Sequence, residues 1–203
     1  MKLQHFVLII VLLTIAFVSK GQSWELAKDK NGVKVYTRKL EGWGIKEYKA
    51  VMDIKTSPAK IVTALKDVPS RYEWAYNSIE IREIERPNSD EVAIYNKVDA
   101  PWPVADRDNI TRFKFSYPSA NLTRVDMTVL KSHAKAPVYD GIVRIERLKG
   151  YWLIRDKGNG WTEVIQQCVA EPGGSLPDWL ANSAVVDRPY NSMYNLKKYV
   201  EKN

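Results

Sequence analysis

The chain has 203 residues, of which 45% are hydrophobic, 27% charged and 11% aromatic. These fractions suit one globular domain of ordinary size, and they exclude a disordered, collagen-like or coiled-coil chain. The single cysteine, Cys168, excludes an intrachain disulfide and a thiolate zinc cluster. Two histidines are too few for a multi-histidine metal site, so we expect no metal and no other cofactor.

The N-terminal segment has the three-part pattern of a secretory signal. A positive charge comes first, an apolar run covers residues 6–18, and small residues follow that run. The run is shorter than the roughly 20 residues of a membrane-spanning helix, although a retained N-terminal anchor is the alternative. We expect cleavage after Gly21, so that residues 1–21 are a signal peptide and residues 22–203 form one exported domain, periplasmic or secreted.

Positive charge predominates in the chain, with 31 Lys and Arg against 24 Asp and Glu. The two signs are interleaved, as in residues 80–86 (EIREIER). An interleaved pattern is typical of a solvated sheet face, whereas a nucleic-acid-binding surface needs clustered cations. We therefore expect no nucleic-acid partner, and only a weak, transient attraction to an anionic membrane surface.

The first predicted elements of the exported domain are two strands and a helix. The strands cover residues 33–38 and 45–54, where β-branched and aromatic residues alternate with polar ones. Ser57 followed by Pro58 has the sequence of a helix N-terminus. Apolar residues then recur at helical spacing until Pro69, which ends the predicted helix.

Seven further strands are predicted after this helix. Short connections between them indicate antiparallel pairing. The sharpest turn signal is residues 158–160 (GNG), because Asn-Gly accepts the positive φ of a tight hairpin. Val125 and Met127 alternate with polar residues, so we expect one apolar face and one wet face. The predicted strands are 78–86, 91–98, 108–117, 122–130, 141–148, 150–156 and 161–170.

A helical pattern extends from about residue 177 to residue 202. Pro189 lies inside it and predicts a kink or a division into two helices. The order of elements predicts an α+β fold, a curved antiparallel sheet wrapped around a long C-terminal helix, with an interior hydrophobic cavity between them. The apolar stripe of this helix consists of Asn182, Val186, Pro189, Met193, Leu196 and Val200.

Four stretches of the chain carry a family resemblance. They are Trp74 after the first helix, residues 101–108 with the pattern Pro-x-x-x-Arg-Asp, residues 150–164 with GYWLI and WTEV, and residues 172–182 before the terminal helix. In this order and spacing, over roughly residues 25–202, the chain resembles the START domain family, the steroidogenic-acute-regulatory-related lipid-transfer proteins, in a secreted bacterial version.

The resemblance implies a helix-grip fold whose deep tunnel holds one lipid or another hydrophobic small molecule, with the terminal helix as a lid. It implies binding and carriage or sequestration rather than catalysis, in a protein that we expect to be monomeric. Some relatives in the wider superfamily cyclise aromatic polyketides, so a cyclase- or hydrolase-type enzyme acting in the same cavity is the alternative. A filled core that serves as an interaction domain is a third possibility.

Arg107 is the most informative charged residue because Asp106 and Asp108 flank it. These three residues could tie the loop to the following strand through charge-assisted hydrogen bonds. Alternatively, Arg107 could face the tunnel and bind an anionic head group. Gln166 lies on an apolar strand face with Cys168, and a buried amide there needs a partner that a ligand could supply.

The remaining candidates lie on predicted interior faces or in loops. Phe113 and Phe115 share one strand face with Thr111, whereas Ile110 and Arg112 take the other. A solid core and a cavity wall give the same periodicity, so both interpretations stay open. Trp102 and Trp43 lie in predicted loops and could rest on a membrane interface. The candidate ligand-binding residues are Trp102, Arg107, Thr111, Phe113, Phe115, Met127, Trp152, Gln166, Asn182, Val186 and Met193.

No catalytic residue is predicted. Cys168 would need a nearby base to act as a nucleophile, and His133 is the only candidate in the exported domain. A lone cysteine in a strand is more often a small buried apolar residue. We therefore expect Cys168 to be part of the core.

Overall fold

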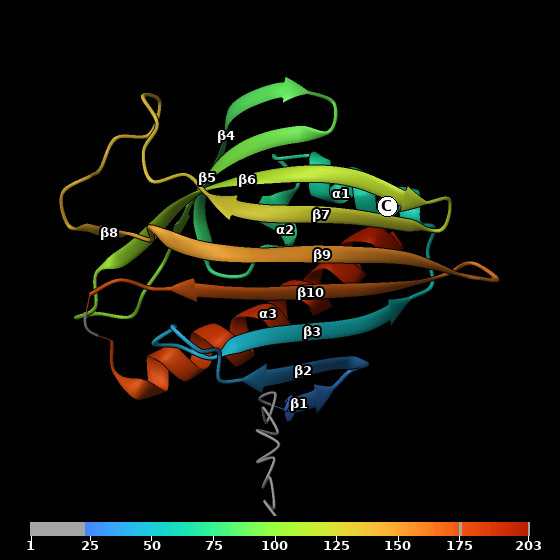
Figure 1. Cartoon of the computed structure of the whole chain (residues 1–203), viewed down its shortest axis with the longest axis horizontal. Coiled ribbons are helices and arrows are strands. Elements are labelled where there is room, and N and C mark those ends of the chain that lie inside the picture. The colour runs from blue at the N-terminus through green and yellow to red at the C-terminus, as the bar shows by residue number, and fades with distance from the viewer. Residues whose placement is uncertain (1–22, 175, 203) are drawn as a thin grey trace, which may run out of the picture.

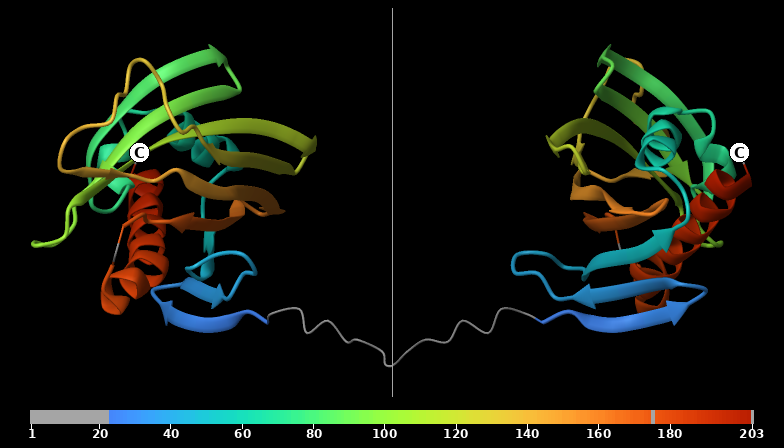
Figure 2. Two further views of the ribbon diagram at one scale, coloured as in Figure 1. Left: turned by 60° about the vertical axis from the view of Figure 1, so that its left-hand side comes forward. Right: turned by 90° about the vertical axis from the view of Figure 1, so that its right-hand side faces the viewer.

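A curved ten-stranded sheet wraps around one long helix in the computed structural model, which describes residues 23–174 and 176–202 (Figure 1). The helix lies against the concave face of the sheet (Figure 2). This arrangement confirms the predicted α+β helix-grip fold. The predicted signal peptide, residues 1–21, lies outside the described residues.

The strand order in the sheet is β1-β2-β3-β10-β9-β7-β6-β5-β4, and β8 pairs with β6 beside this path. All pairs along the path are antiparallel, whereas β8 is parallel to β6. The strands are β1 (Glu25–Lys30), β2 (Val33–Arg38), β3 (Glu47–Ile54), β4 (Ser78–Asn88), β5 (Glu91–Val98), β6 (Asp106–Ser119), β7 (Leu122–Val129), β8 (Ile142–Arg144), β9 (Arg147–Gly158) and β10 (Trp161–Glu171).

In the described part of the chain, three helices cover the concave side of the sheet: α1 (Pro58–Lys66), α2 (Arg71–Trp74) and α3 (Asp178–Lys202). Helix α1 has Ser57 as its N-cap and Pro58 at its first position, as the sequence predicts. The short helix α2 was not predicted, because four residues are too few to show a helical period.

Helix α3 is continuous from residue 178 to residue 202, so the predicted division at Pro189 does not occur. Proline removes one intrahelical hydrogen bond, but packing on both sides of this position holds the helix together. Pro189 is itself buried, and Met193, Leu196 and Val200 are at most 2% exposed in the main core.

The predicted strand over residues 141–148 is wrong. Only Ile142–Arg144 form a strand there, and β9 begins already at Arg147 as one long strand. The cause is a buried ion pair, because Arg144 Nη2 donates to Asp108 Oδ2 at 2.9 Å and keeps β8 beside β6. Strand β1 was missed because its sequence, ELAKDK, is charged and exposed, as is usual at a sheet edge.

Part of the outer, convex face of the sheet is buried and does not contact solvent. Ile110 and Tyr95 are fully buried there in a second apolar cluster. Ala136, from the connection between β7 and β8, completes that cluster. The expectation of one apolar and one wet face therefore fails at this position, because a long connection folds back over the sheet (Figure 1).

Candidate functional site

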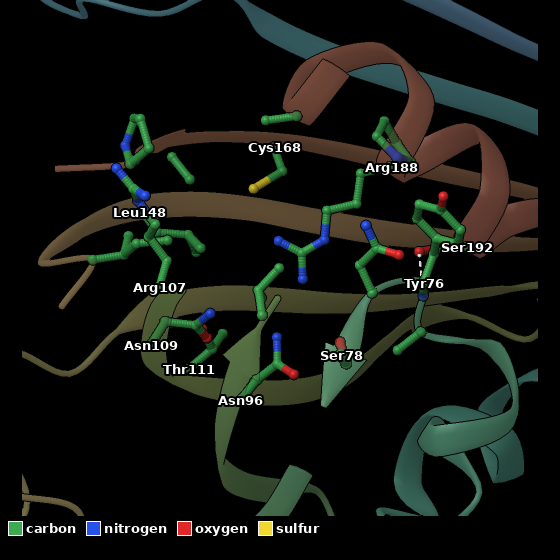
Figure 3. A pocket seen from close by; sticks show the side chains of 18 of the residues that line it. Tyr76, Ser78, Asn96, Arg107, Asn109, Thr111, Leu148, Cys168, Arg188 and Ser192 are labelled. Carbon is green, nitrogen blue, oxygen red and sulfur yellow. Dashed lines mark hydrogen bonds between the residues drawn. The ribbon is translucent and has the colours of Figure 1, made fainter. Parts of the chain in front are cut away.

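A pocket of about 260 Å³ lies between the concave face of the sheet and α3. Strands β5, β6, β7, β9 and β10 supply one wall, and α3 supplies the opposite wall (Figure 3). The volume is just below the range of roughly 300–1,000 Å³ that is typical of sites for drug-sized ligands. The apolar part of the lining includes Trp74, Ile94, Phe113, Met127, Trp152 and Val185.

Trp152 forms a rigid part of the pocket wall. Its indole Nε1 donates a hydrogen bond to Met127 Sδ at 3.1 Å. Its ring meets that of Trp74 edge to face, with the centroids 6.3 Å apart. Such contacts fix aromatic side chains in place, so the wall presents a preformed apolar surface.

Several buried polar atoms in the lining have no hydrogen-bond partner within the described part of the chain. A buried polar atom without a hydrogen bond costs about 1–3 kcal/mol. The pocket is therefore a place where polar groups of a ligand can form hydrogen bonds. The atoms are Arg71 Nε, Trp74 Nε1, Ser78 Oγ, Asn96 Oδ1, Arg107 Nε and Gln166 Oε1.

Arg107 lies at the start of β6 and lines the pocket. The carboxylates of its two sequence neighbours, Asp106 and Asp108, are not part of the pocket lining. Asp106 pairs with Lys97 at 3.2 Å, and Asp108 pairs with Arg144. Burial lowers the pKa of Arg107, and Asp106 opposes that effect. The two carboxylates therefore hold the start of the strand in place, which is the structural role that the sequence suggested. Arg107 itself lies in the pocket lining, which is the position that the alternative interpretation gave it.

Arg71, from α2, is a second cation in the lining and was not among the predicted residues. Its Nη2 donates to the carbonyl oxygen of Leu65 at 2.6 Å, and its guanidinium lies 4.3 Å from the ring centroid of Phe113. Burial, reinforced by the charge of Arg86, lowers the pKa of Arg71 to about 9. No periodic signal marks this residue, because α2 is so short.

Cys168 and Tyr48 share a side-chain hydrogen bond at the edge of the pocket. Burial raises the pKa of the Cys168 thiol to about 12, and it raises that of Tyr48 well above its ordinary value. His133 is not part of the pocket lining, and its Nε2 lies 4.0 Å from Glu85. Burial thus keeps the thiol protonated, although its hydrogen bond with Tyr48 opposes this effect.

The structure brings six of the predicted site residues together in the pocket and leaves five outside its lining. Phe115 and Met193 are buried in the core beside the pocket. Asn182 is exposed, and Trp102 is 93% exposed in the connection between β5 and β6. The residues in the lining are Arg107, Thr111, Phe113, Met127, Trp152 and Gln166.

Val186, the fifth residue outside, is replaced in the lining by its neighbour Val185. Val185 precedes Leu196 by about three full helical turns, so both lie on the same face of α3. The predicted stripe reached Val186 by alternating steps of three and four residues, and this average period of 3.5 residues drifts around a helix that has 3.6 residues per turn.

Sequence reasoning also missed several polar residues of the pocket. Asn109 lies on the same face of β6 as Thr111, whose Oγ1 donates to Asn109 Oδ1 at 2.8 Å. Asn96 lies on the same face of β5 as Ile94. The alternation that identified Phe113 as an interior residue would have found both asparagines, had polar residues been included.

Residues 23–174 and 176–202 contain neither a candidate membrane-spanning helix nor a candidate metal site. No helix there combines the length and the apolar composition that a membrane crossing requires. No group of three or more histidine, cysteine, aspartate or glutamate side chains there is arranged to hold a metal ion.

The family model of the START domain matches residues 17–188 of the chain. The chain belongs to the START domain family. A solved relative, described as a STAR-related lipid transfer protein from Xanthomonas axonopodis, has a TM-score of 0.79 and 30% identity, over 88% of this chain and 98% of its own.

Two curated proteins also match almost the whole chain. An uncharacterised protein of Pseudomonas aeruginosa is 38% identical over 187 residues, which are 90% of this chain and 89% of that protein. The phosphatidylcholine transfer protein of Mus musculus is 25% identical over 183 residues, 88% of this chain and 84% of its own. The START family, expected from four short stretches, is thereby confirmed.

Proposed function

We propose that this protein binds one lipid or other hydrophobic small molecule in the pocket beneath α3 and carries or sequesters it. The observation that carries this proposal is the pocket itself, a preformed apolar space with unpaired polar atoms in its walls. Apolar surface removed from water contributes about 25 cal/mol per Å², which gives a hydrophobic ligand its driving force. Membership of a family whose named relatives include lipid transfer proteins supports it.

The START fold alone would also allow an enzyme of the cyclase or hydrolase kind. Such an enzyme needs titratable groups that converge on one point of the cavity. In the described lining the Cys168 thiol stays protonated and pairs with Tyr48, and Asp99 is an exposed carboxylate at the margin. We therefore propose binding without catalysis. The presence of an open pocket also argues against a filled core.

The location and mode of action belong to the same proposal. The signal-like residues 1–21 support export to the periplasm or beyond, where one protein molecule carries one ligand as a monomer. Ligand exchange requires α3 or the connection between β5 and β6 to move away from the sheet. Trp102 projects from that connection and would contact a membrane surface during exchange.

Native mass spectrometry of the protein purified from its own host tests the proposal. We expect a mass increment that organic extraction recovers as one lipid class, in a ratio of one molecule to one chain. A substitution that fills the pocket, Ala184→Trp on α3, should reduce this ligand-bound fraction at least about tenfold. The matched control is Ala181→Trp on the same helix, which does not line the main pocket.

A ligand-free mass alone does not decide the question, because a ligand can dissociate during purification. The apo protein is therefore also titrated with sterol, phosphatidylcholine and fatty acid. Absence of binding to every one of these classes, together with the ligand-free mass, would contradict the proposed function.

A further inference from the structure

The charge of the pocket lining is strongly one-sided. Lys46, Arg71, Arg107 and Arg188 contribute four cations, whereas Asp99 is the one carboxylate among the described lining residues. Asp99 is exposed, so it lies in water rather than against the buried arginines. A cavity with apolar walls and an excess of one charge attracts ligands of the opposite charge.

The four cations differ in whether they already form hydrogen bonds or ion pairs with other groups of the protein. Lys46 pairs with Glu25 at 3.3 Å, and Arg71 donates to the carbonyl oxygen of Leu65. Arg107 donates through Nη1 to the carbonyl oxygen of Ala105. Within residues 23–174 and 176–202, Arg188 alone of the four forms no hydrogen bond and no ion pair with another residue. Its neighbour in sequence, Asp187, forms an ion pair with Lys28, with Lys28 Nζ 2.7 Å from Asp187 Oδ1.

Arg188 is placed where it can meet a ligand in the pocket. Its side chain leaves α3 and enters the pocket opposite Asn96 and Asn109 (Figure 3). It is partly buried, and the titratable groups that act on its charge are the neutral Tyr48 and Cys168. Burial lowers the pKa of Arg188, because the cation is only partly solvated there.

An unpaired cation in such a position costs folding free energy, and an anion that binds it offsets this cost. A guanidinium presents a planar set of donors that suits a carboxylate or a phosphate. The larger part of the pocket surface is apolar, and at about 260 Å³ the pocket suits one hydrocarbon chain better than a two-chain phospholipid. The ligand that satisfies all three conditions is a single-chain anionic amphiphile.

We propose that Arg188 binds the anionic group, a carboxylate or a phosphate, of a single-chain amphiphile whose hydrocarbon part fills the pocket. This proposal rests on the proposed function, and it adds the chemical class of the ligand and the residue that recognises it.

Isothermal titration calorimetry with three probes of the same chain length tests this proposal. Palmitate and 1-palmitoyl lysophosphatidate carry the two candidate anions, and hexadecanol is the neutral control. The anions are used below their micellar concentrations and hexadecanol below its solubility limit. A charge-assisted hydrogen bond contributes about 1.5–3 kcal/mol, so at least one of the two anions should bind about tenfold or more tightly than hexadecanol. The anion that does so identifies the group that Arg188 recognises.

The variant Arg188→Gln should remove this preference, so that the anions and hexadecanol then bind with about equal affinity. Lys198→Gln is the matched control, since it removes one positive charge from the exposed side of the same helix. That control should keep the preference. Arg188→Lys keeps the charge but loses the planar donor set, and we expect it to keep only part of the preference.

Thermal unfolding of the ligand-free protein separates recognition from a structural role. Arg188→Leu should raise the melting temperature, because it removes an unpaired, partly buried cation. A lower melting temperature combined with an unchanged affinity for both anions would identify Arg188 as a structural residue and overturn the proposal.

The outcomes also separate this proposal from the proposed function. Equal binding of all three probes would overturn the role of Arg188 and leave lipid binding intact. Absence of binding to these probes, to sterol and to phosphatidylcholine would overturn both.

Discussion

Cys168 illustrates how a residue's environment decides its chemistry. The thiol is buried on β10 and hydrogen-bonded to Tyr48, and its pKa of about 12 leaves it protonated at every physiological pH. A reactive cysteine instead needs a partly exposed, electropositive site that lowers the pKa of its thiol. Arg188 does lower the pKa of Cys168, but burial is the larger effect.

We predict that the native protein reacts with Ellman's reagent at pH 8 at less than about 1% of the rate of the guanidinium-unfolded chain. Rapid labelling of the native protein would contradict this prediction.

The raised pKa of Cys168 also makes the stability of the protein depend on pH. As the pH rises above about 8.5, the unfolded chain loses this proton before the folded protein does, so this thiol lowers the free energy of unfolding. The variant Cys168→Ala should lose less free energy of unfolding than the wild type as the pH rises above about 8.5.

At the scale of elements, the contact between β9 and β10 depends on a glycine. Gly150 lies opposite Cys168 in this antiparallel pair. A Cβ atom at Gly150 would be 2.4 Å from the carbonyl oxygen of Gln167 and 2.9 Å from Cys168 Cα. Both are backbone atoms, so the strands would have to move apart under the pocket. Gly150 thus belongs to the resembling stretch 150–164 for a steric reason.

We predict that Gly150→Ala lowers the free energy of unfolding by about 2 kcal/mol, as overpacking of a tight contact does. Urea titration followed by tryptophan fluorescence measures this change. Gly44→Ala is the matched control, because nothing lies within 4 Å of a Cβ atom there. Equal stability of the two variants would refute the steric explanation.

At the scale of the whole molecule, two exposed tryptophans flank the same part of the pocket. Trp102 is 93% exposed and follows the lining residues Asp99 and Ala100. Trp179 is 61% exposed and precedes the lining residue Leu180. Tryptophan favours the interface between water and lipid, so this end of the molecule is suited to the proposed exchange of ligand with a membrane.

We predict that Trp102→Ala reduces association with phosphatidylglycerol-containing vesicles by about threefold to tenfold, since it removes a large interfacial side chain. Affinity for a soluble ligand should not change, because Trp102 does not line the pocket. Vesicle sedimentation measures the first quantity and calorimetry the second. The control Trp161→Ala removes an exposed tryptophan from the hairpin between β9 and β10. Equal losses for the two variants would exclude a specific membrane contact at Trp102.

Much of this fold could be predicted from the sequence, because it depends on residues that are close together in the chain. Strands β2 and β5 have the predicted bounds, and α1 begins at the Ser57-Pro58 pair. The hairpin at residues 158–160 has positive φ at all three positions. Alternation on β6 and β7 correctly assigned Phe113 and Met127 to the interior. These features depend on neighbours in sequence, whose sterics and polarity are the same in any tertiary context.

Only the tertiary structure decided the features that depend on residues far apart in the chain. The pairing of Asp108 with Arg144 divided a predicted strand, and the β7–β8 connection buried Ile110 on the outer face. Whether Phe113 packs in a solid core or lines a pocket depends on how closely α3 approaches the sheet. The rotation of α3 against the sheet likewise brought Val185 and Arg188 to the pocket and turned Asn182 outward. Periodicity gives the face of each element, but packing between elements determines what that face meets.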